Sequence, residues 1–208
     1  MTSDANGAEV KAWLESATVL LGTLPQGIAD HCERVSGVSR GLAERCGVEP
    51  DLAALGGLLH DVARGLSGAE MLKFCQDHDI QVGPVEASQP VLLHGAVGAT
   101  IVRKELGIDD QALLTAITWH STGRGGMSAL EKIVFLADKL DPGKAGYYPP
   151  GLEALPSLAA QDLDQALLMY YDWLLSNLIQ TNKLIHTATI EARNYIIGQL
   201  GNTQSRSV

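Results

Sequence analysis

The sequence predicts an all-α protein with one main domain, on the basis of three observations. Apolar residues recur every three or four positions along most of the 208-residue chain, as they do on one face of an amphipathic helix. We find no run in which apolar and polar residues alternate as they do in a half-buried strand. Glycine, proline and helix-capping residues divide the chain into segments of helical length. The expected architecture is therefore a helical bundle.

Four helices and one loop are expected in the first half of the chain. The helices are expected at residues 10–21, 28–46, 50–62 and 67–74. Pro50 suits the first position of a helix, where its missing N–H has no partner to lose. Ser67 and Glu70 have the spacing of a capping box, which predicts a helix start. Residues 77–90 contain Gly83, two prolines and several polar residues, so we expect a loop there.

The second half is expected to form five more helices, followed by a polar tail. These helices are expected at residues 91–106, 109–120, 128–140, 163–182 and 187–200. Ser128 and Glu131 form a second capping box, and residues 143–156 are expected to be an ordered loop. The chain is thus divided into an N-terminal helical segment packed on the core (1–26), the main domain (27–200) and a polar tail (201–208).

Composition limits the class of protein and of partner. The fractions of 46% hydrophobic and 19% charged residues are ordinary for a soluble domain. A net charge of −9 argues against a nucleic-acid polymer as the main partner, because phosphate backbones bind basic surfaces. The three cysteines are odd in number and lack a CxxC spacing, so neither a disulfide framework nor a zinc ribbon is indicated. Residues 1–10 lack the features of a signal peptide and no apolar run is long enough for a membrane, so we expect a cytoplasmic protein.

Six side chains of metal-ligand type are expected to point into the core. They are His31, His60, Asp61, His94, His120 and Asp138. His31, for example, belongs to the apolar stripe of residues 28–42, and Asp138 follows Val134 by four positions. Any one of the histidines could be an ordinary core residue satisfied by hydrogen bonds. Six such burials together favour a shared metal centre, since buried polar groups are costly unless they are satisfied.

The residue types suggest which metals and which chemistry such a centre would support. Imidazole and carboxylate groups suit iron, manganese, cobalt or zinc. Asp61 has two oxygens and can bridge two ions, and two ions roughly 3.5–4 Å apart bind phosphate oxygens and a bridging hydroxide. The sequence therefore predicts hydrolysis of a phosphate compound, with this hydroxide as the nucleophile and Asp61 as a catalytic residue.

Candidates for binding an anionic substrate lie close to these residues in the sequence. Arg64 follows His60 by one helical turn, and a glycine-rich run follows His120. The candidate substrate-binding residues are Arg64, Ser121, Thr122, Gly123, Arg124 and Lys144. Backbone N–H groups and guanidinium groups are common phosphate partners. Arg64 and Arg124 are also expected to act in catalysis, by neutralising charge in the transition state.

At this point the residues resemble a known family, the HD-domain metal-dependent phosphohydrolases. Within that family the chain is most similar to the YqeK-type symmetrical bis(5′-nucleosyl)-tetraphosphatases. The resemblance is carried by residues 31–35, 57–64, 93–99, 119–127, 130–139 and 191–195. The His-Asp pair is weak evidence by itself, whereas the run from His120 to Met127 is specific. The main domain (27–200) is therefore expected to be an HD domain.

The resemblance implies a di-iron centre, with manganese or cobalt as alternatives, and hydrolysis of diadenosine tetraphosphate to two ADP. By motif, one metal would be held by His31, His60, Asp61 and Asp138, and the other by Asp61, His94 and His120. The chain departs from the family in three places. Ile28 and Lys144 stand where the family has a basic residue and an arginine, and Arg64 stands where a lysine is common. These differences affect the expected substrate contacts and leave the metal set intact.

Two other functions use the same metal core. One is an HD-type nucleotidase or phosphodiesterase acting on another nucleotide, and the other is a di-iron oxygenase. The glycine-rich loop after His120 favours a phosphate substrate over the oxygenase. The expected partner is a small nucleotide, with no membrane partner, and a homodimer is compatible with the sequence.

Overall fold

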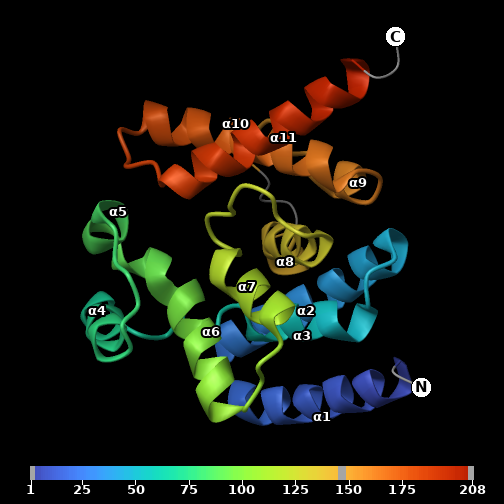
Figure 1. Ribbon diagram of the computed structural model, residues 1–208. Coiled ribbons are helices and arrows are strands. Elements are labelled where there is room, and N and C mark those ends of the chain that lie inside the picture. Colours follow the sequence, from blue (N-terminus) through green and yellow to red (C-terminus); the bar gives the residue numbers. More distant parts are fainter. Residues whose placement is uncertain (1–2, 145–148, 206–208) are drawn as a thin grey trace.

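The computed structural model describes residues 3–144 and 149–205, and no β-strand occurs within these ranges (Figure 1). Eleven α-helices and two short 3₁₀ helices form in the described residues. In chain order they are α1 (Ser3–Leu21), α2 (Gln26–Cys46), α3 (Pro50–Leu59), α4 (Gly68–Asp77), α5 (Pro84–Ser88), η1 (Pro90–Leu93), α6 (His94–Glu105), α7 (Gln111–Trp119), α8 (Ala129–Lys139), η2 (Pro142–Lys144), α9 (Leu155–Ala159), α10 (Leu163–Gln180) and α11 (Thr187–Ser205). The predicted all-α fold is confirmed.

Helix ends follow from local sequence. Both predicted capping boxes are present: Ser67 and Glu70 cap α4, and Ser128 and Glu131 cap α8. Each box satisfies backbone N–H groups that the first turn of a helix leaves without a partner. Gly47 ends α2 in the left-handed conformation, with φ of +67°, which glycine adopts without a steric penalty.

Helix α3 forms the centre of the bundle and packs against α1, α2, α7 and α8. Its residues from Ala53 to Leu59 are all buried. Small residues let its neighbours approach closely. A β-carbon at Gly57 would lie only 2.8 Å from the carbonyl oxygen of Val35 in α2, and one at Gly56 only 2.7 Å from Val134 in α8. The close approach brings the ends of α2, α3 and α8 to one place.

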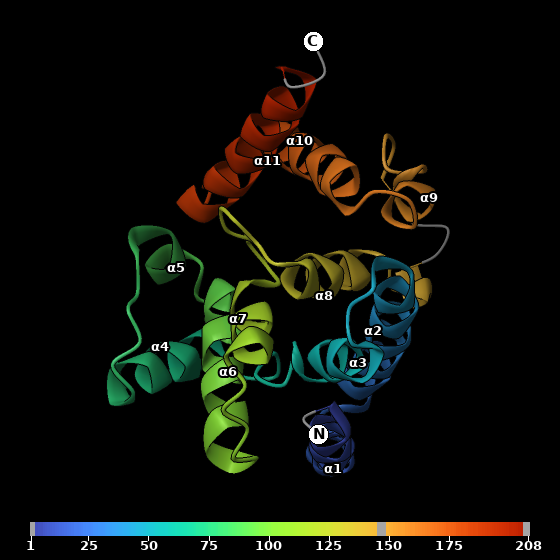
Figure 2. The ribbon, with the colours of Figure 1, turned by 45° about the vertical axis from the view of Figure 1, so that its right-hand side comes forward.

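Helices α9, α10 and α11 form a separate layer that covers α8 on the side away from α1 (Figure 2). Tyr171 in α10 is fully buried and packs against Phe135 of α8, with ring centroids 5.2 Å apart. Helix α8 is therefore buried between this layer and the α2–α3 pair. No helix in the described ranges is both long enough and apolar enough to cross a membrane.

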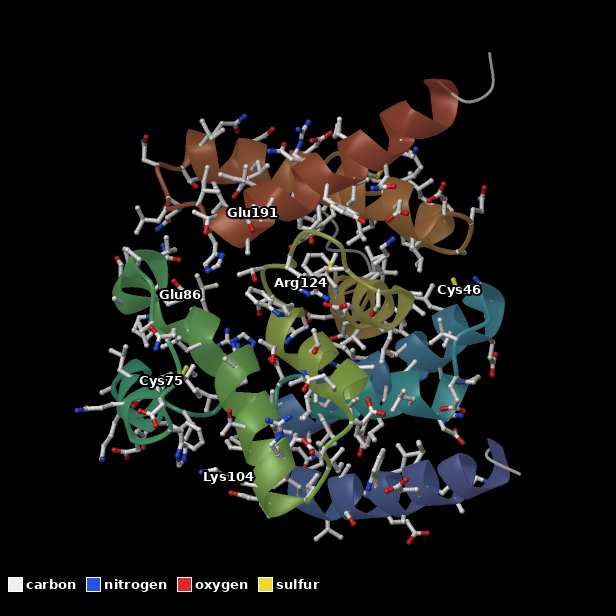
Figure 3. The ribbon with its side chains drawn as sticks, in the orientation of Figure 1. Cys46, Cys75, Glu86, Lys104, Arg124 and Glu191 are labelled. Atoms are coloured by element: carbon white, nitrogen blue, oxygen red, sulfur yellow. The ribbon has the colours of Figure 1, made fainter. Side chains whose placement is uncertain are left out.

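The three cysteines are unpaired, in agreement with the sequence prediction. Cys32 and Cys75 are buried and Cys46 is exposed. Figure 3 shows Cys46 at the end of α2 and Cys75 in α4, in different parts of the bundle.

The structure differs from the predicted elements in several places. The short helix α5 forms inside the predicted loop at 77–90, and α9 begins at the end of the predicted loop at 143–156, of which residues 145–148 lie outside the described residues. The predicted helix at 91–106 begins as the 3₁₀ helix η1, and α11 continues to Ser205, into the predicted tail. Helix α3 ends at Leu59, so His60 and Asp61 lie in tight turns just beyond it. Prolines that begin short turns explain η1, α5 and part of α9, because proline fits the first turn of a helix as well as a loop.

Candidate metal centre

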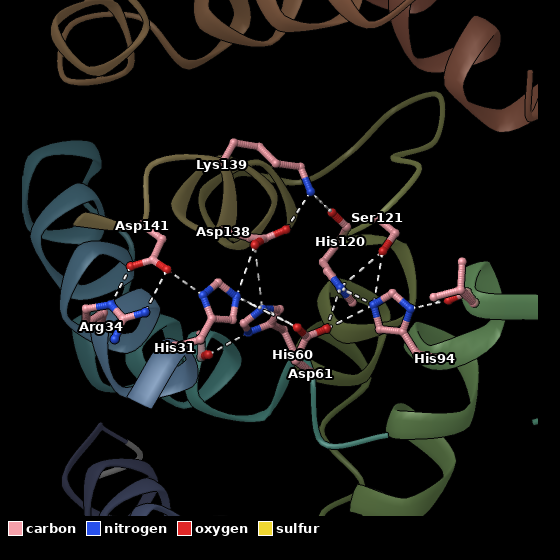
Figure 4. A network of polar contacts seen from close by, with 12 residues as sticks. His31, Arg34, His60, Asp61, His94, His120, Ser121, Asp138, Lys139 and Asp141 are labelled. Carbon is pink, nitrogen blue, oxygen red and sulfur yellow. Dashed lines mark hydrogen bonds and ion pairs between the residues drawn. The ribbon is translucent and has the colours of Figure 1, made fainter. Parts of the chain in front are cut away.

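The six predicted metal-binding side chains come together at one point of the molecule (Figure 4). His31 lies on α2, and His60 and Asp61 follow α3. His94 begins α6, His120 follows α7, and Asp138 lies in the last turn of α8. The prediction that each lies within its own helix is thus corrected for His60, Asp61 and His120, which lie just beyond helix ends.

The side chains form two groups that share Asp61. In the first group, the Nε2 atoms of His31 and His60 are 3.2 Å apart, and Asp138 Oδ1 lies 3.2 Å from His31 Nε2. In the second, the Nε2 atoms of His94 and His120 are 2.8 Å apart. Asp61 Oδ1 lies 3.0 Å from His94 Nε2, whereas its Oδ2 lies 3.7 Å from both His31 Nε2 and His60 Nε2. Each carboxylate oxygen of Asp61 therefore faces a different group.

Helix ends fix the orientation of three of these histidines in the same way. The Nδ1 of His60 contacts the carbonyl oxygen of Gly57, three residues earlier, at 2.7 Å. His120 makes the same contact with Ile117 at 2.7 Å, and His94 with Val91. Carbonyl groups in the last turn of a helix lack a helical partner, so they are free to accept a proton from the ring.

These contacts determine which ring nitrogen can bind a metal. A carbonyl oxygen can only accept, so each of these Nδ1 atoms must carry the proton. Each Nε2 therefore presents a lone pair to the centre. Two such lone pairs at 2.8 Å, as in His94 and His120, repel each other unless a cation lies near both. A neutral imidazole with Nδ1–H bound to a carbonyl is the usual state of a histidine that binds metal through Nε2. The donor set fits metal ions.

Electrostatics keep the centre in a metal-binding state. Burial lowers the pKa of His60 to about 4, aided by the nearby His120. Burial also lowers the pKa of His120, so both rings are neutral at pH 7. Although burial raises the pKa of Asp61, its net pKa lies below its usual range, so its carboxylate is ionised at pH 7. Neutral imidazoles and an ionised carboxylate are the forms that ligate metals.

A cavity of about 420 Å³ opens onto the centre. Its lining includes five of the six predicted ligands and the four further residues Arg64, Val91, Leu92 and Ser121. The Ser121 hydroxyl lies 3.2 Å from the Nε2 atoms of both His94 and His120. Arg64 and Ser121 are thus the predicted substrate-binding residues that the structure brings to the cavity.

The rest of the predicted anion-binding loop makes structural contacts away from this lining. Arg124 forms a two-pronged ion pair with Glu131, a buried carboxylate, at 2.6 and 2.8 Å. Thr122 is buried and its carbonyl accepts from the hydroxyl of Thr189. Gly123 has φ of +67°, and a β-carbon there would lie 1.9 Å from the Tyr171 hydroxyl. The side chain of Lys144 lies outside the described residues.

Sequence reasoning missed three residues beside the centre. Asp141 Oδ2 contacts His31 Nδ1 at 2.7 Å, and Arg34 pairs with the same carboxylate. Lys139 is mostly buried and donates to Asp138 Oδ2 at 2.6 Å. The available signal was partly spacing: Arg34 follows His31 by three positions and lies near it on the same face of α2, whereas Asp141 lies beyond the end of α8.

Comparison with known proteins gives matches over most of the chain. Residues 28–143 match the HD domain family. The chain is 30% identical to the symmetrical bis(5′-nucleosyl)-tetraphosphatase of Bacillus subtilis (strain 168), over 80% of this chain and 88% of that protein. It is 33% identical to the protein of the same name from Halalkalibacterium halodurans, over 75% and 81% respectively. A crystal structure from Clostridium acetobutylicum, described as a predicted HD superfamily hydrolase involved in NAD metabolism, superposes with a TM-score of 0.84 at 34% identity, covering 89% of this chain and 97% of that one.

Proposed function

The chain belongs to the HD-domain family and, within it, to the symmetrical bis(5′-nucleosyl)-tetraphosphatases, and from this we propose that it hydrolyses diadenosine tetraphosphate to two molecules of ADP. The observation that carries the proposal is the position of Asp61, whose two carboxylate oxygens face two separate groups of histidine nitrogens. This arrangement supports a dinuclear metal site bridged by one carboxylate. Iron is the metal we propose, with manganese and cobalt as alternatives.

The residues would divide between two ions. His31, His60 and Asp138 would hold one ion, His94 and His120 the other, and Asp61 both. Two ions bound there would polarise phosphoryl oxygens and lower the pKa of a water molecule between them. The protein's own contribution is to keep the imidazoles neutral, oriented and largely shielded from bulk water before substrate arrives.

Substrate contacts follow from the cavity. Its volume of about 420 Å³ lies in the lower part of the range of roughly 300–1,000 Å³ usual for small-molecule pockets. The cavity therefore suits one nucleoside diphosphate unit, with the other half of the substrate lying outside. Arg64 would neutralise phosphate charge, and the Ser121 hydroxyl would donate to a phosphoryl oxygen. Direct substrate contacts of Thr122, Gly123, Arg124 and Lys144 stay predictions from the sequence.

The proposed reaction has a defined bond change. The oxygen of water attaches to the second phosphorus of the unit held in the cavity. The bond from that phosphorus to the oxygen shared with the third phosphorus breaks, and the other ADP leaves with this oxygen. Arg64 would stabilise the charge that develops on the non-bridging oxygens, and its position in the cavity lining supports this role.

Hydrolysis in ¹⁸O-labelled water, followed by mass spectrometry, tests this assignment. We expect one labelled and one unlabelled ADP for each substrate molecule. Formation of AMP and ATP would refute the symmetrical cut. The same assay should include deoxynucleoside monophosphates and a cyclic dinucleotide, because faster turnover of these would favour the alternative nucleotidase or phosphodiesterase. Metal analysis of protein purified with and without oxygen would identify the native metal.

Three further expectations from the sequence stay predictions: the cytoplasmic location, the homodimer, and the division of the chain after residues 26 and 200.

A further inference from the structure

His31 is supported by a different kind of group from the other three histidines of the centre. The Nδ1 atoms of His60, His94 and His120 contact backbone carbonyl oxygens of their own turns. The Nδ1 of His31 contacts Asp141 Oδ2 at 2.7 Å, across 110 positions of the chain. A carboxylate carries a full charge and forms hydrogen bonds about twice as strong as a neutral acceptor does.

Asp141 is built into the protein as a fixed carboxylate. It is only 2% exposed and receives hydrogen bonds on both oxygens. Arg34 donates from Nε to Oδ1 at 2.6 Å and from Nη2 to Oδ2 at 3.0 Å, and the backbone N–H of Gly143 donates to Oδ1 at 2.8 Å. A β-carbon at Gly143 would lie 2.6 Å from Arg34 Nη2, so glycine at this position makes room for the guanidinium.

We propose that Asp141, held by Arg34, is a positioning residue that orients His31 and strengthens it as a metal ligand. Of the two ions, the one at His31, His60 and Asp138 is therefore the more tightly bound. A carboxylate behind a metal-binding histidine fixes the ring and raises the basicity of the ligating nitrogen. Asp141 itself reaches the centre only through His31. The inference rests on the proposed metal centre, and its test is independent of substrate and turnover.

The test is a titration of metal-free, full-length protein with Mn²⁺, with the free ion followed by its EPR signal. In the wild type we expect two sites of unequal affinity. In Asp141→Asn, which keeps the shape and removes the charge, the tighter site should weaken about 10–100-fold, the usual effect of losing such a partner. The other site should change less than about threefold. Loss confined to one of two sites is not expected from general destabilisation.

The spectrum of the bound ions supplies a second readout. With one equivalent of Mn²⁺, wild-type chains should hold mostly single ions. In Asp141→Asn the affinities become more equal, so more chains hold two ions and the signal of a spin-coupled pair should grow. Wild-type affinities at both sites in Asp141→Asn would overturn the proposal. Failure of the wild type to bind Mn²⁺ would instead remove the metal centre, and with it the proposed function.

Two further variants guard against effects of folding. Arg34 is 39% exposed in its side chain, so Arg34→Ala should fold and should weaken the same site in the same direction, by less than Asp141→Asn. If Asp141→Asn fails to fold, Arg34→Ala decides, and unchanged affinity there overturns the proposal. Asp162 caps α10 through its side chain, away from the centre. Asp162→Ala is the matched control, with lower stability and unchanged Mn²⁺ affinity expected.

Discussion

Replacing Gly95 by alanine should weaken metal binding, although Gly95 is not among the proposed ligands. Gly95 lies in the first turn of α6, where it contacts the last turn of α7. A β-carbon there would lie 2.4 Å from the carbonyl oxygen of Thr118 and 2.9 Å from that of Ile117. Both are backbone atoms, so no side-chain rotation can relieve the overlap. To restore a separation of about 3.4 Å, α6 would have to move by about 1 Å from α7.

This displacement acts directly on the centre because His94 precedes Gly95 and His120 follows α7. Their Nε2 atoms are 2.8 Å apart in the structure. Metal–ligand distances tolerate only about 0.2 Å of error, so a shift of about 1 Å should weaken the ion held by these two histidines at least tenfold. Overpacking of a tight contact should also cost roughly 1–3 kcal/mol of unfolding free energy.

Calorimetric titration with Mn²⁺ and thermal unfolding of the metal-free protein measure the two effects. Gly41→Ala in α2 is the matched control, because a β-carbon at Gly41 meets no atom within 4 Å. It should gain about 0.5–1 kcal/mol of stability, as expected for glycine replaced inside a helix, with unchanged metal affinity. If Gly95→Ala binds two ions with wild-type affinity and unfolds at the wild-type temperature, the inferred tight contact between α6 and α7 is wrong.

Three other outcomes are expected. Asp61→Ala should lose both ions on gel filtration, since its oxygens face both groups, and retention of two ions would argue against a bridge. Arg64→Ala should lower kcat/KM with metal content unchanged. Arg124→Ala should mainly lower the free energy of unfolding, by about 1–3 kcal/mol, because it leaves the buried Glu131 unpaired. Kinetics and thermal unfolding of both variants test this, and a stability loss in Arg64→Ala with a kinetic loss in Arg124→Ala would contradict it. His60 has a pKa of about 4 in the folded protein, below its unfolded value of about 6.5, so the unfolded chain takes up the proton first as the pH falls. The metal-free protein should therefore lose up to about 3 kcal/mol of unfolding free energy between pH 6.5 and pH 4. An unfolding free energy from urea titration that stays constant over this range would contradict this.

The parts of the site that could be predicted from the sequence are those determined by local chemistry. The two capping boxes were recognisable because both partners lie within three residues of each other. The convergence could be inferred in part because ligands such as His31 and Asp138 lie on apolar stripes, which show the direction of a side chain relative to the core. The exact helix ends were harder to predict. His60 and Asp61 lie within an apolar run that looks helical in sequence, whereas the backbone there already forms tight turns.

The parts that were missed depend on pairs that are distant in the sequence or on competing uses of one residue. The contact of Asp141 with Arg34 spans 107 positions, so no local pattern indicates it. Nothing local indicates either that Glu131, already used in a capping box, also binds the guanidinium of Arg124. A glycine-rich loop has the same composition whether its residues face a ligand or pack against a buried tyrosine such as Tyr171.

The position of the six residues along the chain has a consequence for how the protein is made. All six lie between residues 31 and 138, so a nascent chain cannot complete the set until α8 has been synthesised and has docked beside α2. Domains generally fold as units, so the centre is expected to assemble only when the domain itself folds. The four histidines leave the ribosome before Asp138, and helices α9–α11 are synthesised after all six residues. The layer that covers α8 is therefore the last part of the domain to become available for folding.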